Sequence, residues 1–170
     1  MNNSLIPRYA FLVKGTGRHI DRLQAFDKAL LSAGPLAHNL VTVSSILPAG
    51  CKIITPEEGF KLLTPGQITF CVMAKQDSNK KGKIASASVG MIRPGDSYQY
   101  GYISEFHATD KTEDEAKQIA ERLAKEMYMA KLGISEGALN KSEILNVTAA
   151  IEVTQDNEWV SAVAICIFVI

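Results

Sequence analysis

The run Ala162-Val163-Ala164-Ile165-Cys166-Ile167-Phe168-Val169-Ile170 ends the chain and decides the fold. Its β-branched and aromatic residues favour a strand, which we expect to begin at Trp159. No polar residue alternates with the apolar ones, so both faces of this strand must be covered. Two sheets stacked face to face, with helices on the outside, would supply both covers.

Further strands are available for two such sheets. They are expected at residues 9–14, 67–75, 84–92, 97–108 and 142–154, and another begins at Leu40; residues 52–54 are a short apolar segment. Gly15-Thr16-Gly17 is expected to form a turn after the first strand, because glycine adopts the backbone angles that turns need. A short helical turn is predicted for residues 56–63. We therefore predict an α+β fold, in a single domain that spans residues 1–170.

Two longer helices are also predicted. Thr112-Glu113-Asp114-Glu115 has the pattern of a capping box, so a helix should run from it to about Leu132 and end at Gly133. Its apolar stripe should pack on a sheet and consists of Ala116, Ile119, Ala120, Leu123, Met127 and Ala130. The other helix is expected over residues 19–33, followed by the stop signal Gly34-Pro35.

The helix over residues 19–33 has an acidic residue in its apolar stripe. The stripe consists of Ile20, Leu23, Leu30 and Leu31. Asp27 lies near its centre, where a carboxylate is costly unless a cation pairs with it. One interpretation is a structural ion pair with Arg22, Lys28 or a more distant cation. The other is a carboxylate reserved for a cationic ligand, for which a guanidinium is the natural bidentate partner.

Composition restricts the class of protein. The chain has 170 residues, of which 46% are hydrophobic and 21% charged, and Lys plus Arg equal Asp plus Glu at 18 each. A balanced charge gives no global field toward nucleic acid or anionic lipid. The three cysteines are widely spaced and suggest no metal site, and no apolar run is long enough to span a bilayer. Residues 1–7 lack the pattern of a signal peptide, so we expect a soluble, cytoplasmic protein.

Two adjacent serines, Ser44 and Ser45, follow the strand that begins at Leu40. A strand-end turn held by ordinary hydroxyl hydrogen bonds would explain them. Alternatively, each hydroxyl is a latent nucleophile next to a backbone carbonyl. In a strained turn, the Oγ of Ser45 could attack the carbonyl of Ser44 and convert the amide into an ester.

Residues 97–108 contain a glutamate inside a strand pattern. Alternation puts Ile103, Glu105 and His107 on one face of this strand. A sheet surface that faces solvent would explain Glu105. The other interpretation is a general acid, which needs burial to raise its pKa toward neutral pH. His107 could assist such an acid or be structural.

Residues 39–51 resemble the self-cleavage segment of the pyruvoyl-dependent arginine decarboxylases. The similarity continues through Phe11–Gly17, Cys71–Ala74 and Gly101–His107 and covers nearly the whole chain. It implies a four-layer αββα sandwich of two mainly antiparallel sheets. It also implies cleavage between Ser44 and Ser45, into a β chain of residues 1–44 and an α chain of residues 45–170.

The resemblance further implies a cofactor and a reaction. The new first residue of the α chain, formerly Ser45, becomes a pyruvoyl group, with no metal and no pyridoxal phosphate. Its ketone forms a Schiff base with L-arginine and accepts the electron pair released with CO2. Protonation by Glu105 then leads to agmatine.

Three further residues receive roles from the resemblance. Asp27 would meet the substrate guanidinium, with Leu23 beside it. Asn39 would take part in processing or in the site, although about 20 Å of straight strand separates it from Ser45. The family implies a homo-oligomer, a trimer or hexamer of cleaved protomers with sites between neighbours, and no nucleic acid or membrane partner. Two alternatives remain: a pyruvoyl decarboxylase for another amino acid, or an unprocessed, non-enzymatic oligomeric binding or regulatory domain.

Overall fold

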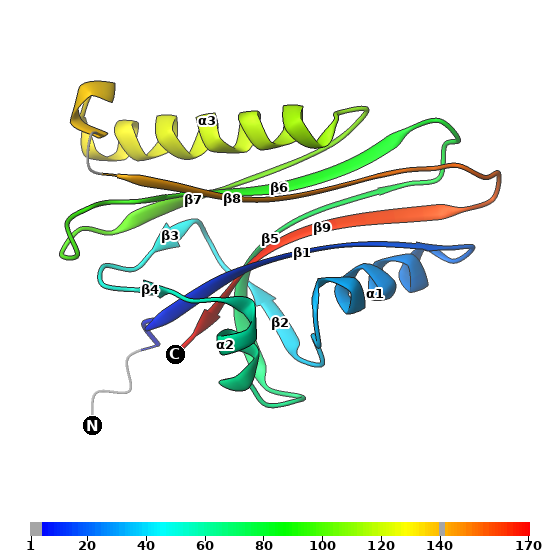
Figure 1. Ribbon diagram of the computed structural model, residues 1–170, viewed down its shortest axis with the longest axis horizontal. Helices are drawn as coiled ribbons and strands as arrows, with labels where there is room; N and C mark the ends of the chain where they lie inside the picture. Colours follow the sequence, from blue (N-terminus) through cyan, green and yellow to red (C-terminus); the bar gives the residue numbers. More distant parts are fainter. Residues whose placement is uncertain (1–4, 140–141) are drawn as a thin grey trace.

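The fold consists of two stacked sheets with helices outside, as a computed structural model shows for residues 5–139 and 142–170 (Figure 1). The five-stranded sheet contains, in spatial order, β2 (Asn39–Thr42), β5 (Ile68–Ser78), β9 (Trp159–Val169), β1 (Tyr9–His19) and β4 (Lys52–Ile53). The four-stranded sheet contains β3 (Ile46–Leu47), β7 (Gly101–Thr109), β6 (Ile84–Arg93) and β8 (Glu143–Glu152). Most neighbouring strands are antiparallel, and β1–β4 and β2–β5 are parallel. The predicted α+β class and stacked sheets are confirmed.

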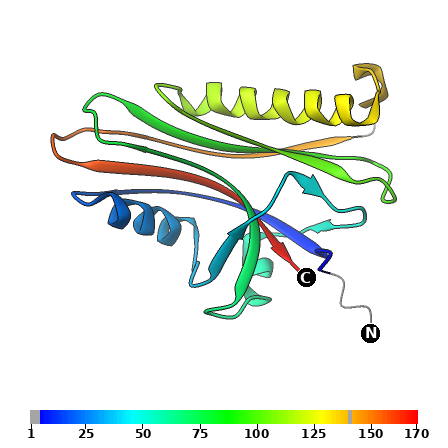
Figure 2. The ribbon, with the colours of Figure 1, turned by 180° about the vertical axis from the view of Figure 1, so that it is seen from behind.

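The helices lie on the outer faces of the two sheets. α3 (Glu113–Leu132) covers the four-stranded sheet, while α1 (Arg22–Ala33) and α2 (Pro56–Lys61) lie on the opposite side of the molecule (Figures 1 and 2). A short 3-10 helix, η1 (Glu136–Leu139), follows α3. The expectation about residues 1–7 falls partly on residues 1–4, which lie outside the described part of the chain.

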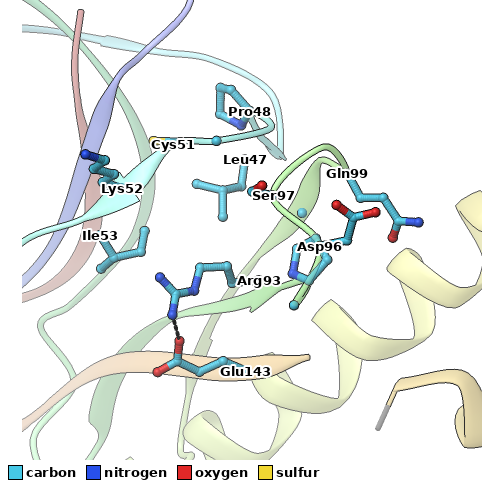
Figure 3. A pocket seen from close by; sticks show the side chains of 14 residues that line it. Leu47, Pro48, Cys51, Lys52, Ile53, Arg93, Asp96, Ser97, Gln99 and Glu143 are labelled. Atoms are coloured by element: carbon cyan, nitrogen blue, oxygen red, sulfur yellow. Dashed lines mark ion pairs between the residues drawn. The ribbon is translucent and has the colours of Figure 1, made fainter. Parts of the chain in front are cut away.

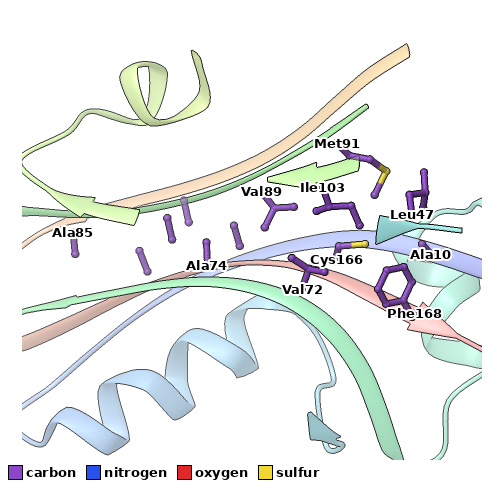
Figure 4. Close-up of a cluster of buried hydrophobic side chains, with 14 of the residues drawn as sticks. Ala10, Leu47, Val72, Ala74, Ala85, Val89, Met91, Ile103, Cys166 and Phe168 are labelled. Atoms are coloured by element: carbon purple, nitrogen blue, oxygen red, sulfur yellow. The ribbon is translucent and has the colours of Figure 1, made fainter. Parts of the chain in front are cut away.

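β9 is the central strand of the five-stranded sheet, and both its faces are buried. It pairs with β1 on one side and β5 on the other, both antiparallel. One face, with Ala162, Ala164, Cys166 and Phe168, contributes to the core between the sheets (Figure 4). The other face, with Val163, Ile165, Ile167 and Val169, packs against residues of α1 and α2. The apolar C-terminal run therefore has the two covers that its sequence requires.

The core between the sheets changes in character along its length. Near one end it is filled by alanines such as Ala74 and Ala85, and near the other by the larger Met91, Leu47 and Phe168 (Figure 4). Small side chains let two backbones approach closely, whereas larger ones hold them apart. The end with the larger side chains is where β3 enters the four-stranded sheet.

The predicted turn at Gly15-Thr16-Gly17 is wrong, because β1 continues through it to His19. A Cβ on Gly15 would lie 2.0 Å from the carbonyl oxygen of Ala29, and one on Gly17 would lie 2.2 Å from that of Ala25. The glycines are therefore needed for the close approach of α1 to the strand. The helix also begins later than predicted, at Arg22, with Asp21 as its N-cap accepting a hydrogen bond from the Gln24 N–H.

The expected burial of the apolar stripe on α1 is also wrong. Ala25 and Ala29 are the buried residues of this helix. Ile20, just before the helix, is 79% exposed, Leu23 is 74% exposed and Leu31 is 64% exposed. The alanines dock on the glycines of β1, and of the predicted stripe only Leu30 is partly buried against the sheet.

α3 agrees with its prediction more closely. Both halves of the capping box form between Thr112 and Glu115, and Gly133 ends the helix with a left-handed backbone. The predicted Ala116 and Ala120 are buried, together with Ala124 and Tyr128. The stripe is thus rotated slightly from the predicted one, and Met127 is 38% exposed.

Two strand boundaries differ from the prediction. β7 begins at Gly101, since Asp96 instead organises a turn by accepting a hydrogen bond from the Tyr98 N–H. β5 extends past residue 75 to Ser78, because Gln76, Asp77 and Ser78 continue the ladder with β9.

Candidate active site

The Ser44-Ser45 pair lies where the chain crosses from one sheet to the other. β2 lies at the edge of the five-stranded sheet and β3 at the edge of the four-stranded sheet (Figure 1). On one side of the pair, the Val43 N–H donates to the carbonyl of Cys71 at 2.9 Å. On the other side, the carbonyl of Ser45 accepts from the Ile103 N–H at 2.8 Å. The two ends of the crossing segment are therefore held by different sheets.

The carbonyl of Ser44 is held in a tight turn. It accepts a hydrogen bond from the Ile46 N–H at 3.1 Å, which closes a three-residue turn centred on Ser45. Positive φ values among non-glycine residues described occur at Asp110 and Asn157, so the turn at Ser45 is of the inverse, less strained type. An N–H directed at the carbonyl oxygen polarises the bond between Ser44 and Ser45. The φ values show no strain at Ser45, although the sequence led us to expect it. The expected polarisation of the Ser44 carbonyl has a donor, the Ile46 N–H.

Glu105 lies along the strand that holds Ser45. Ile103 and Leu47 are both buried in the core between the sheets, and Glu105 is two residues after Ile103 on the same face of β7. Ser45 is two residues before Leu47. The intervening Ser104 faces the other way and donates from its Oγ to the carbonyl of Ala120 in α3 at 2.6 Å. This alternation places Glu105 on the side of β7 that faces the five-stranded sheet, near the crossing.

The surroundings of Glu105 favour its protonated form. Partial burial raises the pKa of Glu105, and the charge of His107 lowers it to a smaller extent. Glu105 still has an exposed surface, so its carboxyl can be reached from outside. Burial raises the pKa of Cys71 to about 12, with a smaller contribution from Glu105 when that carboxyl is ionised, so the thiol stays neutral. A carboxyl with a raised pKa beside an accessible serine is suited to donate a proton.

His107 contacts a residue that sequence analysis did not single out. Its Nδ1 lies 3.3 Å from Oε1 of Gln76, which belongs to β5 of the opposite sheet. Gln76 was missed because the strand prediction ended at residue 75. The alternation of Val72 and Ala74, which are both in the core between the sheets, would have placed it on the correct face.

Asp27 and Leu23 lie on the other side of the five-stranded sheet from Glu105. α1 packs on the outer face of that sheet through Ala25 and Ala29, and Asp27 is two residues from each, on the opposite face of the helix. Asp27 is exposed and has no ion pair within residues 5–139 and 142–170. The structural pair considered for it is not formed there, since Arg22 binds Asp77 at 2.8 Å instead. Within one chain, therefore, the structure does not bring Asp27 and Leu23 to Ser45.

Asn39 lies at the start of β2, also away from the serine pair. Its Nδ2 donates to the carbonyl of Gly66 at 2.8 Å, and its backbone N–H donates to Gln67 at 2.9 Å. These bonds fix the turn before β5 against the first residue of β2. In the single chain Asn39 thus supports the strand that leads to the serines.

A hollow of about 540 Å³ opens at the wide end of the core between the sheets. It is lined by the β3–β4 turn and the β6–β7 loop, with an ion pair between Arg93 and Glu143 on one wall (Figure 3). Leu47 connects this hollow to the crossing segment, and the residues predicted for the site do not line it.

Neither a metal cluster nor a membrane helix is found in the described part of the chain. There, no three His, Cys, Asp or Glu side chains gather in a way that could hold a metal ion. None of the helices described has the length and apolar character needed to cross a bilayer.

The fold and site together define an α+β sandwich with a serine pair at the crossing between its sheets and, on the adjoining strand β7, a glutamate whose pKa is raised by burial. The family model for pyruvoyl-dependent arginine decarboxylase matches residues 9–170. The chain belongs to this family, as its sequence resemblance indicated.

Curated relatives extend over much or all of the chain. "Pyruvoyl-dependent arginine decarboxylase 1" of Methanosarcina acetivorans is 39% identical over 170 residues, which cover 100% of both chains. "Pyruvoyl-dependent arginine decarboxylase" of Methanococcoides burtonii is 49% identical over 130 residues, 76% of this chain and 72% of the relative. "Probable pyruvoyl-dependent arginine decarboxylase" of Chloroherpeton thalassium is 39% identical, with 96% of this chain and 98% of the relative covered.

Proposed function

We propose that this protein cleaves itself between Ser44 and Ser45 and then converts L-arginine to agmatine and CO2. The observation that carries the proposal is the hydrogen-bonded Ser44 carbonyl at the crossing between the sheets, on the same side of β7 as Glu105. The names of its relatives supply arginine as the substrate.

The cleavage needs only groups of the crossing segment and water. The Oγ of Ser45 attacks the carbonyl carbon of Ser44, and the amide nitrogen leaves as an amine, which gives an ester. Loss of the Cα proton of Ser45 then breaks its Cβ–Oγ bond and releases the Ser44 carboxylate. Water replaces the nitrogen of the resulting dehydroalanine, ammonia departs, and a pyruvoyl group remains. The Ile46 N–H stabilises the oxyanion that develops on the Ser44 carbonyl oxygen in the first step.

Both products of cleavage would stay in place. The β chain, residues 1–44, contributes β1, which pairs with β9 over its full length from Tyr9 to His19. The α chain, residues 45–170, is held at its new end by the Ile103 N–H and by Leu47, which is 1% exposed. Each side of the broken bond is anchored to a different sheet, so a nick should leave the sandwich folded.

The residues near Ser45 fit the group that this cleavage would produce. A pyruvoyl group supplies a carbonyl that binds the substrate amine and accepts the electron pair released with CO2. The Ile103 N–H holds the carbonyl of residue 45, which fixes the orientation of the group. Burial raises the pKa of Glu105, which suits this carboxyl to donate a proton to the substrate carbon after CO2 leaves.

The guanidinium end of arginine would be bound by a second copy of the chain. Asp27 and Leu23 form an exposed, partly apolar surface on α1, and β2 with the crossing segment exposes Val41, Val43 and Ile46. Contact between these two surfaces is heterologous, and a rotation of about 120° per protomer would close it into the three-membered ring that the family implies. It would place the Asp27 carboxylate of one protomer at the Ser45–Glu105 site of the next. We assign this assembly to the cytoplasm, with arginine and agmatine as its small-molecule partners.

Mass spectrometry of the purified protein tests the proposal directly. The wild-type chain should separate into two pieces cut between residues 44 and 45, and the Ser45→Ala variant should remain one chain of 18.5 kDa. Release of CO2 should be faster from arginine than from ornithine or lysine. An intact wild-type chain after long incubation would support the non-enzymatic alternative. Cleavage with preference for another amino acid would support a different pyruvoyl decarboxylase.

A further inference from the structure

Gln76 and His107 connect the two sheets beside Glu105. Gln76 lies on β5 on the same face as Val72 and Ala74, and His107 lies on β7 on the same face as Ile103 and Glu105. Their side chains meet through Oε1 and Nδ1 at 3.3 Å. This contact is not needed to hold the sheets together, since the apolar core between them already does so.

The orientation of the Gln76 amide is fixed by a second hydrogen bond. Its Nε2 donates to the carbonyl oxygen of Asp77 at 2.8 Å. A carbonyl oxygen only accepts hydrogen bonds, so the nitrogen of the amide must face Asp77 and the oxygen must face His107. The amide oxygen also only accepts, and therefore Nδ1 of His107 must carry the proton. The second ring nitrogen, Nε2, remains the position at which the ring gains or loses its charge.

His19 provides the opposite case within the same chain. Its Nδ1 accepts a hydrogen bond from the Asp21 N–H at 3.0 Å. That nitrogen must be unprotonated, so a neutral His19 carries its proton on Nε2. The structure thus assigns different tautomers to two histidines of one protein.

We propose that Gln76 and His107 are positioning residues for Glu105: Gln76 fixes the His107 ring in the Nδ1–H tautomer, so that the ring gains its charge at Nε2 alone, on the face of β7 that carries Glu105. This inference rests on the proposed role of Glu105 as proton donor and assigns a means of controlling it. A neutral ring leaves the proton on Glu105, whereas a charged ring favours its release.

The other groups around Glu105 do not compete with His107 for this role. β6 places Val89 opposite Glu105, and the crossing segment from Val43 to Ser45 has no ionisable side chain. β5 contributes the Cys71 thiol, which burial and the charge of Glu105 keep neutral. α3 packs on the other face of β7, at Ser104. Among the described residues, His107 is the group whose charge acts on Glu105, and it lowers the pKa of that carboxyl.

Nitrogen NMR of the full chain labelled with 15N-histidine tests the tautomers. In one wild-type spectrum above pH 7.5, the shifts of His107 should be those of an Nδ1–H ring and the shifts of His19 those of an Nε2–H ring. The Gln76→Met variant should lose the Nδ1–H signature of His107 and leave His19 unchanged. Gln118→Met, on the exposed face of α3, is the matched control and should change neither. An Nε2–H or averaged His107 in the wild type would overturn the proposal.

Carbon NMR of the Glu105 carboxyl tests the control of its proton. Because the charge of His107 lowers the pKa of Glu105, His107→Asn should shift that titration to higher pH, while His19→Asn should not move it. In the cleaved enzyme, the alkaline limb of the kcat profile should move in the same direction. An unchanged Glu105 titration in His107→Asn would refute the proposal. The NMR readings do not need turnover, so they stand or fall independently of the decarboxylation assay.

Discussion

α1 and α3 dock on their sheets in the same way but treat their larger apolar residues differently. Each presents alanines to a glycine-bearing strand: Ala29 approaches Gly15 of β1, and Ala120 approaches Gly90 of β6. On α3 the apolar residues next to this contact are mostly covered, and Met127 is 38% exposed. On α1 they remain open, with Leu23 at 74% and Leu31 at 64% exposed.

The difference shows that the chain covers the apolar face of α3 more completely than that of α1. α3 completes its packing within the chain and places charged residues toward solvent. α1 packs on its sheet through its alanines and Leu30, and it leaves Leu23 and Leu31 exposed on the face that carries Asp27. Exposed apolar residues that are gathered on one face indicate a binding surface rather than a solvated one. Because Asp27 lies on this face, the surface combines apolar side chains with a carboxylate, the chemistry that suits a cationic ligand.

The largest effect is expected where both helices approach glycine. Gly15→Ala places a Cβ 2.0 Å from the Ala29 carbonyl, and Gly90→Ala places one 2.5 Å from that of Ala120. Backbone atoms cannot move aside cheaply, so each variant should lose about 3 kcal/mol in its free energy of unfolding, measured by urea denaturation. Gly137→Ala has no atom within 4 Å of the added Cβ and serves as control. If one glycine variant is as stable as the wild type, its helix does not dock as described.

The open face of α1 is tested by changing its charge. Leu31→Glu should disrupt the assembly, measured as a loss of mass in light scattering, because a carboxylate cannot be buried in an apolar contact without a partner. The unfolding free energy of the isolated protomer should change by no more than about 0.5 kcal/mol, since Leu31 is exposed within the chain. Met127→Glu on α3 should keep the wild-type mass. An assembled Leu31→Glu protein would assign the interface to another surface.

Substitution of Asp27 tests whether this carboxylate binds the substrate or is only a surface charge. Asp27→Asn should raise KM for arginine by about 10- to 100-fold, the value of one charged hydrogen bond, with little change in self-cleavage. Glu121→Gln on α3 should leave both unchanged. An unaltered KM in the Asp27 variant would favour a substrate without a guanidinium.

The smallest effect concerns the pH dependence of stability at the start of α1, where Arg22 pairs with Asp77 of β5. Burial by itself would raise the pKa of Asp77, but Arg22 and Lys75, which both contact its carboxylate, outweigh burial and lower the pKa. A pKa lowered by folding stabilises the protein above about pH 4 and loses this contribution as the pH falls through the folded value. Asp77→Asn should therefore remove about 1 kcal/mol or less at pH 7, because Arg22 is largely exposed, and flatten the acid limb of stability.

The control for this acid limb is the start of α3. Glu115→Gln affects a capping box that is exposed to solvent, and α1 should remain docked in that variant. Hydrogen exchange of the α1 amides at pH 3 and pH 7 measures the difference. If the exchange rates of the α1 amides change equally with pH in wild type and Asp77→Asn, Asp77 does not contribute to the pH dependence of stability.

Much of the fold was predictable because its signals are local. The unbroken apolar run of β9 required covers on both faces, and the Thr112–Glu115 pattern fixed the start of α3. Alternation along β7 placed Ile103, Glu105 and His107 on one face. Gly15 and Gly17 misled the prediction, because glycine permits both a tight turn and the close approach of a helix, and the choice depends on residues 25–33.

By itself, then, the sequence determined the class of fold, the serine pair and the carboxyl that can act as an acid, since periodicity and residue chemistry are properties of short segments. Only the tertiary structure decided that Ser45 and Glu105 lie along the same strand edge, that Gln76 reaches His107, and that Leu23 and Leu31 of α1 face outward. Periodicity states which residues share a face. Which face is covered depends on surfaces contributed by distant parts of the chain, and the described residues leave Leu23 and Leu31 of α1 uncovered.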